Sequence, residues 1–515
     1  MIPDVDPWNE EVKPFYKKES YVPCNKFKLL TYIVKNSSSA ILHVNDEVKK
    51  FYSSKPIKCC YINVTRNENA TVPDNHITFS KCTDFNSRLD ITGRTVTVKC
   101  RSKNIVYSNS YSPITITKNL QTKMQIYANL TKKESKPLNV LFIGIDSISR
   151  LNFIRTMQKS RQFLVNTGWV EYKGYNKIAD NTFPNLVAML TGKHFLAGFK
   201  TCNPYIKLGC LDKANFIWSD YQKLGYITAY AEDESSINTF NYNKKGFLHE
   251  PVDYYLRAYS VAINKLQKKV VDEMEYCTGP ESSGERILKV ATDFIDTFID
   301  YPTFGFFWMN SFSHNILNAP TRMDDKVFKV LESIYKSKYS NNSVIIFLSD
   351  HGIRFGNIRA TRTGWLEERL PFLYFWFPKW FRHKYPEQYY NLITNAKSRL
   401  TTPYDVYMTV QDILVLSGLK YKIKPSEGCP ACKSLFTPIP FRSCEDLNGL
   451  LGWYGKAAEK CAKYGVSKVL RAGISAESSR SKEVYLLVVV ETVPEAIFES
   501  TLVVEAGEVT RGSYL

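Results

Sequence analysis

The chain has 515 residues, of which 44% are hydrophobic, and a formal net charge of +18. This length and composition exclude a single small core and a disordered chain, so several packed domains are expected. No apolar run reaches the roughly 18 residues that span a bilayer, and the first residues lack the apolar stretch of a signal peptide.

Lysines and arginines are dispersed along the chain, without long basic runs. No helix-turn-helix or zinc-finger spacing accompanies them, so specific nucleic-acid binding is the least favoured of the function classes considered. A basic surface can instead attract an anionic substrate or a membrane.

Residues 1–137 are predicted to form a β-rich, cysteine-containing N-terminal domain. The stretches AILHVNDEV, IKCCYINVTR and TVTVKCRS have β-branched and alternating patterns between polar loops. A charged segment, TKKESKP, then separates this part from the next.

Twelve cysteines favour disulfides over a zinc ribbon, because the one C-x-x-C pair, Cys429 and Cys432, has no second pair and no nearby histidine. Adjacent Cys59 and Cys60 are expected to take different partners. Five Asn-x-Ser/Thr acceptors, four of them near the N-terminal cysteines, point to an extracellular or lumenal glycoprotein of the secretory pathway. A cytosolic protein with unused acceptors is the alternative.

Residues 138–425 alternate strand-like and helix-like runs, which is typical of an α/β domain. The predicted strands are 138–145, 168–172, 225–230, 303–309, 343–349 and 371–376. The predicted helices are 153–165, 184–191, 285–299, 324–338 and 404–417. Residues 426–515 are predicted to form a cysteine-containing α+β region, with a helix over 447–463 followed by the strand-like runs EVYLLVVVET and ESTLVVEAGEV.

Two of the predicted strands stop at an aspartate. Asp146 follows NVLFIGI, and Asp350, with His351 directly after it, follows SVIIFLS. Ligands of open parallel sheets bind at the carboxyl ends of strands. A buried carboxylate there needs a cation or several donors, and two carboxylates with a histidine form a plausible ligand set for zinc or manganese. Each aspartate alone is more often a helix cap or turn former.

A third motif, DNTFPNLVAMLTGK, predicts a helix that starts near Pro184 and ends at Gly192. Thr182 then lies at or just before the helix N-terminus, where backbone N–H groups favour anions. A metal-bound threonine hydroxyl there can act as a nucleophile. An ordinary capping threonine is the alternative.

In combination, GIDSISR, TFPN and LSDHG resemble the alkaline phosphatase superfamily. TFPN resembles the nucleophile motif of nucleotide pyrophosphatase/phosphodiesterases, and the Asp, Thr, Asp-His set resembles the single-metal site of lipoteichoic acid synthases. More closely, the chain is similar to the domain-of-unknown-function 229 family, a sulfatase-like animal group. The motifs that carry this resemblance are GIDSISRLNF, AEDESSINTFNY, PVDYYLR, FWMNSFSH, SDHGIRFG and EERLP. This resemblance covers roughly residues 20–510.

The resemblance implies an α/β fold with an alkaline-phosphatase-like central mixed, mostly parallel sheet flanked by helices. It implies that Asp146, Asp350 and His351 bind one divalent metal, zinc or manganese. Thr182 would bind the same ion and attack phosphorus, forming a phosphothreonine. His314, in NSFSH, would bind substrate or a second metal.

Several positions depart from the related enzymes. Asn310 stands where the phosphodiesterases have an aspartate ligand, and TRTGWLEERLP lacks their further histidine, for which Glu367 or Glu368 is a conceivable substitute. Asp233, in AEDES, is a weaker site candidate. CNPYI at Cys202 lacks the arginine of a formylglycine motif, so formylglycine sulfatase chemistry is not expected.

The favoured function is therefore a metal-dependent hydrolase or transferase acting on phosphate esters, of the phosphodiester or phosphoglycerol type, through a threonine nucleophile. The alternative is a catalytically inactive sulfatase-like ectodomain that binds a glycan or protein partner. The expected partner is an anionic phosphate- or sulfate-ester substrate. Family members are expected to be membrane-anchored, although this chain shows no anchor.

Overall fold

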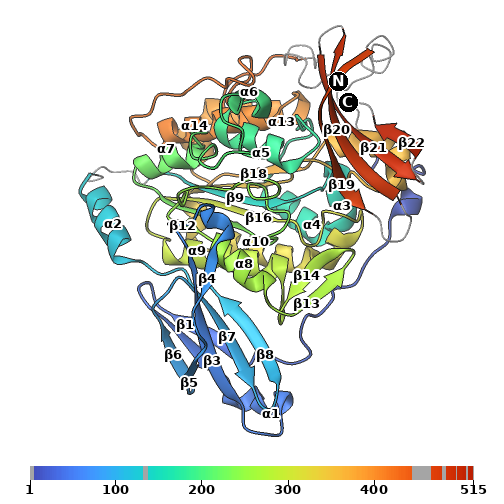
Figure 1. Cartoon of the computed structure of the whole chain (residues 1–515). Helices are drawn as coiled ribbons and strands as arrows, with labels where there is room; N and C mark the ends of the chain where they lie inside the picture. The colour runs from blue at the N-terminus through green and yellow to red at the C-terminus, as the bar shows by residue number, and fades with distance from the viewer. Residues whose placement is uncertain are drawn as a thin grey trace. The chain divides into compact units, whose positions relative to one another are not determined.

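Figure 1 shows the computed structural model, which describes residues 5–130, 137–442, 465–477, 483–493, 496–505 and 508–513. Two compact units, Met1–Phe441 and Arg442–Leu515, make up the chain. The division of the first unit near residue 137, into a β-rich domain and an α/β domain, remains our proposal, as does a C-terminal region that begins at residue 426.

A mixed sheet of seven strands forms the centre of the first unit. In spatial order its strands are β10 (Val170–Glu171), β18 (Leu373–Trp376), β17 (Ser343–Leu348), β9 (Asn139–Ile145), β16 (Thr303–Met309), β11 (Ile227–Glu232) and β12 (Tyr254–Tyr255). The five strands from β17 to β12 run parallel, and β18 and β10 are antiparallel to their neighbours. The predicted α/β fold class with a mixed, mostly parallel sheet is confirmed.

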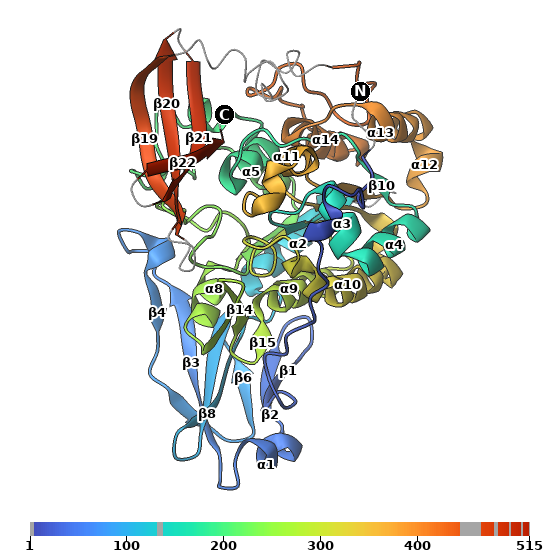
Figure 2. The ribbon, with the colours of Figure 1, turned by 90° about the vertical axis from the view of Figure 1, so that its right-hand side faces the viewer.

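Helices cover both faces of this sheet, as Figures 1 and 2 show. One face packs against α5 (Thr182–Thr191), α7 (Ile217–Lys223), α13 (Pro386–Ser398) and α14 (Pro403–Leu416). The other packs against α3 (Arg150–Thr156), α4 (Gln158–Thr167), α8 (Arg257–Asn264), α9 (Ser283–Thr297) and α10 (Asp324–Lys336). Every residue of β9 is buried, because alternate side chains enter the two cores, as is typical of parallel sheets.

The predicted helix 153–165 is wrong as a single element. The chain leaves helical geometry at Met157, which separates α3 from α4. The first turn of α4 is capped from a distance: Asp324 accepts hydrogen bonds from the Lys159 and Ser160 backbone N–H groups, at 2.8 and 2.9 Å. The other helices and strands predicted within 138–425 are confirmed to within two residues at each end.

The N-terminal β structure consists of two small sheets. One contains β1 (Thr31–Lys35), β2 (Ala40–Val44) and β6 (Arg88–Ile91). The other contains β4 (Ile77–Phe79), β3 (Lys58–Arg66), β7 (Thr95–Arg101), β8 (Ile105–Tyr111) and, paired with β3, β5 (Thr83–Phe85). The predicted β-rich character of this segment is confirmed.

Ten of the twelve cysteines form disulfides. The pairs are Cys24–Cys277, Cys59–Cys100, Cys60–Cys82, Cys202–Cys210 and Cys429–Cys432. The adjacent cysteines on β3 take different partners, as predicted, and the C-x-x-C pair is a disulfide. Cys444 and Cys461 lie outside the described residues.

In the second unit the described residues form a four-stranded antiparallel sheet. Its strands are β19 (Gly465–Glu477), β20 (Glu483–Val493), β21 (Ala496–Glu505) and β22 (Glu508–Ser513). The predicted run EVYLLVVVET corresponds to β20, whereas the predicted run ESTLVVEAGEV contains parts of two strands, β21 and β22. The predicted helix 447–463 lies outside the described residues.

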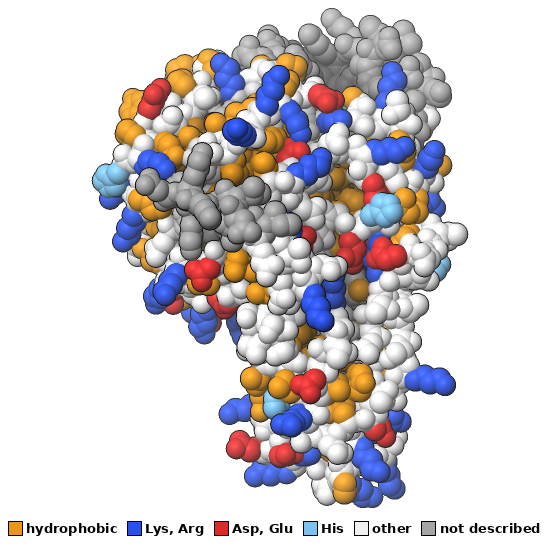
Figure 3. Space-filling view, turned by 90° about the vertical axis from the view of Figure 1, so that its left-hand side faces the viewer, with side chains coloured by type: hydrophobic (Ala, Val, Ile, Leu, Met, Phe, Trp, Pro, Cys, Tyr) orange, Lys and Arg blue, Asp and Glu red, His pale blue; other side chains and the backbone are white. Residues whose placement is uncertain are grey.

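The charged side chains show no single large basic region on the face in Figure 3, where lysines and arginines are scattered among acidic and hydrophobic groups. Among the described helices, none has the length and apolarity needed to cross a membrane.

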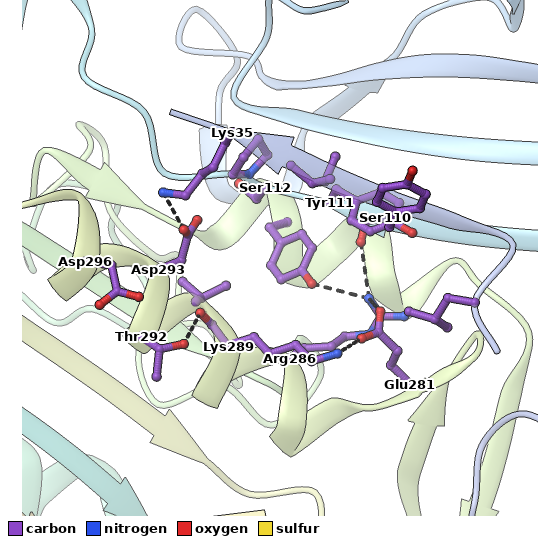
Figure 4. A pocket seen from close by; sticks show the side chains of 16 residues that line it. Lys35, Ser110, Tyr111, Ser112, Glu281, Arg286, Lys289, Thr292, Asp293 and Asp296 are labelled. Carbon is purple, nitrogen blue, oxygen red and sulfur yellow. Dashed lines mark hydrogen bonds and ion pairs between the residues drawn. The ribbon is translucent and has the colours of Figure 1, made fainter. Parts of the chain in front are cut away.

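A pocket of about 410 Å³ lies where β1 and β8 meet α8 and α9 (Figure 4). Its charged lining is largely paired. Lys35 of β1 forms an ion pair with Asp293 of α9, and Lys289 forms one with Glu281 within the α/β part. The Lys35–Asp293 pair joins the N-terminal β structure to the helices below the central sheet.

Arg286 is the buried centre of this junction. It is 1% exposed and donates hydrogen bonds to Asn109 Oδ1 at 2.6 Å and to the Thr278 carbonyl at 2.5 Å. It also lies 3.3 Å from Glu281. Burial raises the pKa of Glu281, but Arg286 and Lys289 outweigh burial and lower that pKa to about 2.

We expect Arg286→Met to lower the free energy of unfolding of the first unit by about 3–5 kcal/mol, because it leaves buried acceptors and a buried carboxylate without their cation. Lys289→Met is the matched control: its side chain is 61% exposed, so its loss should cost about 1 kcal/mol or less. Urea denaturation measures both, and equal effects would contradict this role for Arg286.

Candidate metal centre

Two carboxylates follow neighbouring parallel strands at the same edge of the central sheet. β9 ends at Ile145 and β17 at Leu348, and Leu348 pairs with Gly144. Continued by two residues, this register places Asp350 level with Asp146. The structure thus brings the two predicted aspartates to the edge where open α/β sheets bind ligands.

His351 completes a compact cluster with these aspartates. One ligand atom from each of the three residues lies within 4.8 Å of the others. His351 Nε2 is 3.2 Å from Asp350 Oδ2 and 3.9 Å from Asp146 Oδ1, and all three residues are buried. His351 Nδ1 faces the Gly352 carbonyl at 2.8 Å, which assigns the proton to Nδ1 and leaves the Nε2 lone pair for a metal.

The electrostatics of the cluster fit a bound cation. Asp350 Oδ2 and His351 Nε2 are buried and have no hydrogen-bond partner among the described residues. Burial and the Asp146 carboxylate raise the pKa of Asp350 well above its usual range. Burial and the Arg354 cation lower the pKa of His351 to about 3, so the imidazole is neutral at physiological pH. Two oxygen donors and one neutral imidazole suit zinc or manganese.

Ser147 links the two aspartates through a strained backbone. Its φ of 63° lies in the left-handed region, which a residue with a side chain rarely adopts. In this conformation its N–H donates to Asp350 Oδ1 at 3.2 Å, and its hydroxyl donates to Asp146 Oδ1 at 2.6 Å. Such strain persists where the surroundings enforce it, often at functional sites.

Thr182 is the first residue of α5, and its hydroxyl reaches the cluster. Thr182 Oγ1 donates a hydrogen bond to Asp146 Oδ2 at 2.9 Å. Asn185, the last residue of TFPN, holds the preceding turn: its Oδ1 accepts from the Ile178 N–H at 2.8 Å, and its Nδ2 donates to the Ala179 carbonyl at 2.6 Å. The predicted nucleophile therefore lies at a helix N-terminus beside the acidic pair.

His314 lies near the cluster but is not one of its three potential ligands. It is half-buried in the loop after β16, and its Nδ1 is 2.6 Å from Asn315 Oδ1. Burial raises the pKa of Asp146, but His314, followed by His351, outweighs burial and lowers it. His314 is thus within electrostatic reach of the site.

The weaker candidates are engaged elsewhere. Asp233 accepts hydrogen bonds from the Asn310 N–H at 2.8 Å and from the Ser311 hydroxyl at 2.6 Å, so it braces the loop after β16. The Asn310 side chain accepts from Trp308 Nε1 at 3.2 Å. None of these side chains belongs to the potential ligand group found among the described residues.

Glu367 and Glu368, on α11 (Arg362–Arg369), are ion-paired. Glu367 lies 2.5 Å from Arg155, and Glu368 lies 3.0 Å from Lys177. The backbone of this helix packs so closely on the loop after His351 that a Cβ on Gly352 would lie 2.1 Å from the Glu367 carbonyl oxygen. Both glutamates therefore lie beside the loop in ion pairs, outside the potential ligand group found among the described residues.

Ser147, Asn185 and Arg354 are site residues that the sequence interpretation missed. Asn185 is part of the TFPN motif, and the other two lie within three residues of a predicted ligand, so their proximity in sequence was the available signal. Nothing in the sequence indicated the φ of Ser147 or the direction of the Arg354 side chain.

A family model described as "Protein of unknown function (DUF229)" matches residues 17–448, so the chain belongs to this family, as its motifs predicted. No curated protein sequence matches the chain.

Solved structures with a similar arrangement include three bacterial proteins. The periplasmic domain of EcEptC from Escherichia coli has 12% identity and a TM-score of 0.40, with 61% of this chain and 89% of that chain covered. The soluble domain of lipooligosaccharide phosphoethanolamine transferase A from Neisseria meningitidis has 13% identity and a TM-score of 0.35, with 55% and 90% covered. An alkaline phosphatase superfamily protein from Vibrio parahaemolyticus has 14% identity and a TM-score of 0.40, with 78% and 91% covered.

We expect His351→Ala and Asp350→Asn each to remove most of the bound divalent metal, because each deletes one of three ligands. Asp233→Asn is the matched control, since Asp233 is an equally buried carboxylate at the same sheet edge but outside the cluster. Elemental analysis of purified protein measures the metal content. Retention of wild-type metal by His351→Ala would contradict the assigned site.

Proposed function

We propose that the chain is a metal-dependent hydrolase or transferase of phosphate esters, of the phosphodiester or phosphoglycerol type, with Thr182 as its nucleophile. The observation that carries this proposal is the 2.9 Å hydrogen bond from Thr182 Oγ1 to Asp146 Oδ2 at the start of α5. It joins a hydroxyl at a helix N-terminus to the Asp/Asp/His cluster.

A divalent ion held by Asp146, Asp350 and His351 would lower the pKa of the Thr182 hydroxyl and offset negative charge on the ester. Thr182 Oγ1 passes its proton to its acceptor, Asp146, and attacks phosphorus as the bond to the leaving alcohol breaks. This step yields a phosphothreonine. The backbone N–H groups that start α5 favour the anionic phosphoryl group.

We assign His314 to the leaving group, because it lies within electrostatic reach of Asp146. A protonated His314 donates its proton to the departing oxygen, which is the usual role of a general acid. Water or an acceptor hydroxyl then attacks the phosphorus of the phosphothreonine and gives its proton to the now neutral His314, while Asp146 returns its proton to the departing Thr182 oxygen. Hydrolysis and transfer thus differ in the acceptor of the second step.

One ion suffices for this scheme. The described residues offer one group of three potential ligands, and Asn310 is turned toward Trp308. We therefore propose a single ion, zinc or manganese.

We further propose that the protein works in the secretory pathway or outside the cell. Five disulfides support an oxidising compartment. The acceptor asparagines Asn36, Asn69 and Asn341 are exposed, so they are accessible to N-glycosylation. The anionic substrate is a phosphate or sulfate ester.

We expect Thr182→Ala to keep its bound metal and to lower turnover of bis(p-nitrophenyl) phosphate by about 10⁴-fold or more, on the scale of removing a nucleophile. Thr182→Ser restores a hydroxyl and should retain part of the activity. Metal analysis together with steady-state kinetics gives both readouts. A wild-type protein that holds metal but shows no turnover would instead favour the inactive ectodomain.

We expect His314→Ala to lower turnover by about 10²–10⁴-fold, the range for a general acid, while metal content stays near one ion per chain. His314→Ala should lose less activity toward an ester whose leaving group needs no proton than toward an alkyl ester. If the wild type holds two ions and His314→Ala holds one, the single-ion scheme is wrong.

A further inference from the structure

Arg354 lies beside both the proposed nucleophile and the metal cluster. Its Nη1 donates a 2.5 Å hydrogen bond to Asn181 Oδ1, on the residue directly before Thr182. Its charge also contributes to the lowered pKa of His351. Arg354 is therefore within electrostatic reach of a potential metal ligand and bonded to the turn that presents the hydroxyl.

The charge of Arg354 has no acidic partner in the described part of the chain, where no carboxylate lies within 4.0 Å of its guanidinium. Two nearby cations do have an acidic partner: Arg359 lies 2.9 Å from Glu368, and Lys177 lies 3.0 Å from the same carboxylate. The Phe355 ring, 5.5 Å from Arg354, provides a cation–π contact but no compensating charge.

One edge of the Arg354 guanidinium is unused. Among the described residues, neither Nε nor Nη2 has a hydrogen-bond acceptor, and Nε is buried. These two nitrogens form a planar fork that matches two oxygens of a carboxylate or a phosphate. The Nε of this edge is buried without an acceptor, which is costly unless a bound group supplies one.

The ring of His314 lies beside the same loop. Its centroid is 6.1 Å from that of Phe355, the residue after Arg354. Thr182, His314 and Arg354 come from three separate segments, and each is linked to the cluster or to a residue beside it. An ester bound at the cluster could therefore meet a nucleophile, a proton donor and a cation.

The charges of the site favour an anion. A divalent ion would balance Asp146 and Asp350, and the Thr182 hydroxyl adds no charge. The Arg354 cation then remains, together with the protonated His314 of the proposed mechanism, so a negatively charged ester would be electrostatically favoured there.

On the basis of the proposed function, we propose that Arg354 binds the anionic group of the substrate, a phosphate or sulfate ester, through its non-bridging oxygens. The Nε–Nη2 edge receives the two non-bridging oxygens of such a group.

Binding without turnover tests this proposal. In Thr182→Ala protein loaded with metal, isothermal titration measures the affinity for bis(p-nitrophenyl) phosphate, a monoanion. Adding Arg354→Gln should weaken that affinity by about tenfold or more, since it deletes a charge-assisted bidentate contact. Arg354→Lys keeps the charge but loses the fork, so its loss should be smaller. Arg362→Gln, at an exposed arginine on α11, should leave the affinity unchanged.

Two further ligands distinguish the chemical classes. p-Nitrophenyl phosphate offers the same non-bridging oxygens, so its affinity should also fall in Arg354→Gln, and an unchanged affinity would count against the Arg354 contact. p-Nitrophenyl sulfate tests the other ester class. If only the binding of this sulfate depends on Arg354, the anion site is supported and the phosphate-ester function is refuted.

The anion-binding role of Arg354 is refuted if Arg354→Gln binds the diester within about twofold of its parent, a difference below half a kcal/mol by the usual conversion. It is also refuted if Arg354→Gln loses its metal, because the arginine would then support the cluster. The proposed function is tested separately, by wild-type turnover. If the diester binds through Arg354 but is not turned over by the wild type, the anion-binding role of Arg354 still holds and the protein is an inactive ectodomain.

Discussion

Two carboxylates that are buried together cannot both keep their charge without a cation, and the arrangement of the site depends on this constraint. The parallel pairing of β17 with β9 puts Asp350 level with Asp146 at the sheet edge. Hydrophobic cores on both faces remove water from the strands that carry them. The resulting electrostatic conflict is visible in the raised pKa of Asp350 and in the unpaired atoms of Asp350 and His351.

The elements around the pair hold its groups in place at some conformational cost. Ser147 adopts a left-handed backbone so that both aspartates receive a hydrogen bond. Asn185 ties the turn that positions Thr182, and Gly352 allows α11 to pack directly on the loop after His351. A hydroxyl held on a helix N-terminus by packed elements is preorganised, which favours a role in chemistry over simple helix capping.

The N-terminal β structure is joined to the α/β part by covalent and ionic links. The Cys24–Cys277 bond and the Arg286 hydrogen bonds cross this junction. The two sheets have a small core of their own, built around Leu30, Leu42 and Val98. Small cores provide limited stability, so the disulfides Cys59–Cys100 and Cys60–Cys82 add to it by restricting the unfolded chain.

Local patterns in the sequence determined the strands and most helices of the central sheet and the candidate ligands, because burial and periodicity are encoded locally. The mixed and mostly parallel character of the sheet was expected from the family resemblance. The sequence also placed Thr182 near a helix start through Pro184. Only the tertiary structure decided what depends on distant residues: Asp324 caps the second of the two helices that replace the predicted helix 153–165, Glu367 and Glu368 are occupied by ion pairs, and the Arg354 side chain turns toward Asn181. These outcomes depend on contacts between segments far apart in the chain, which no local pattern specifies.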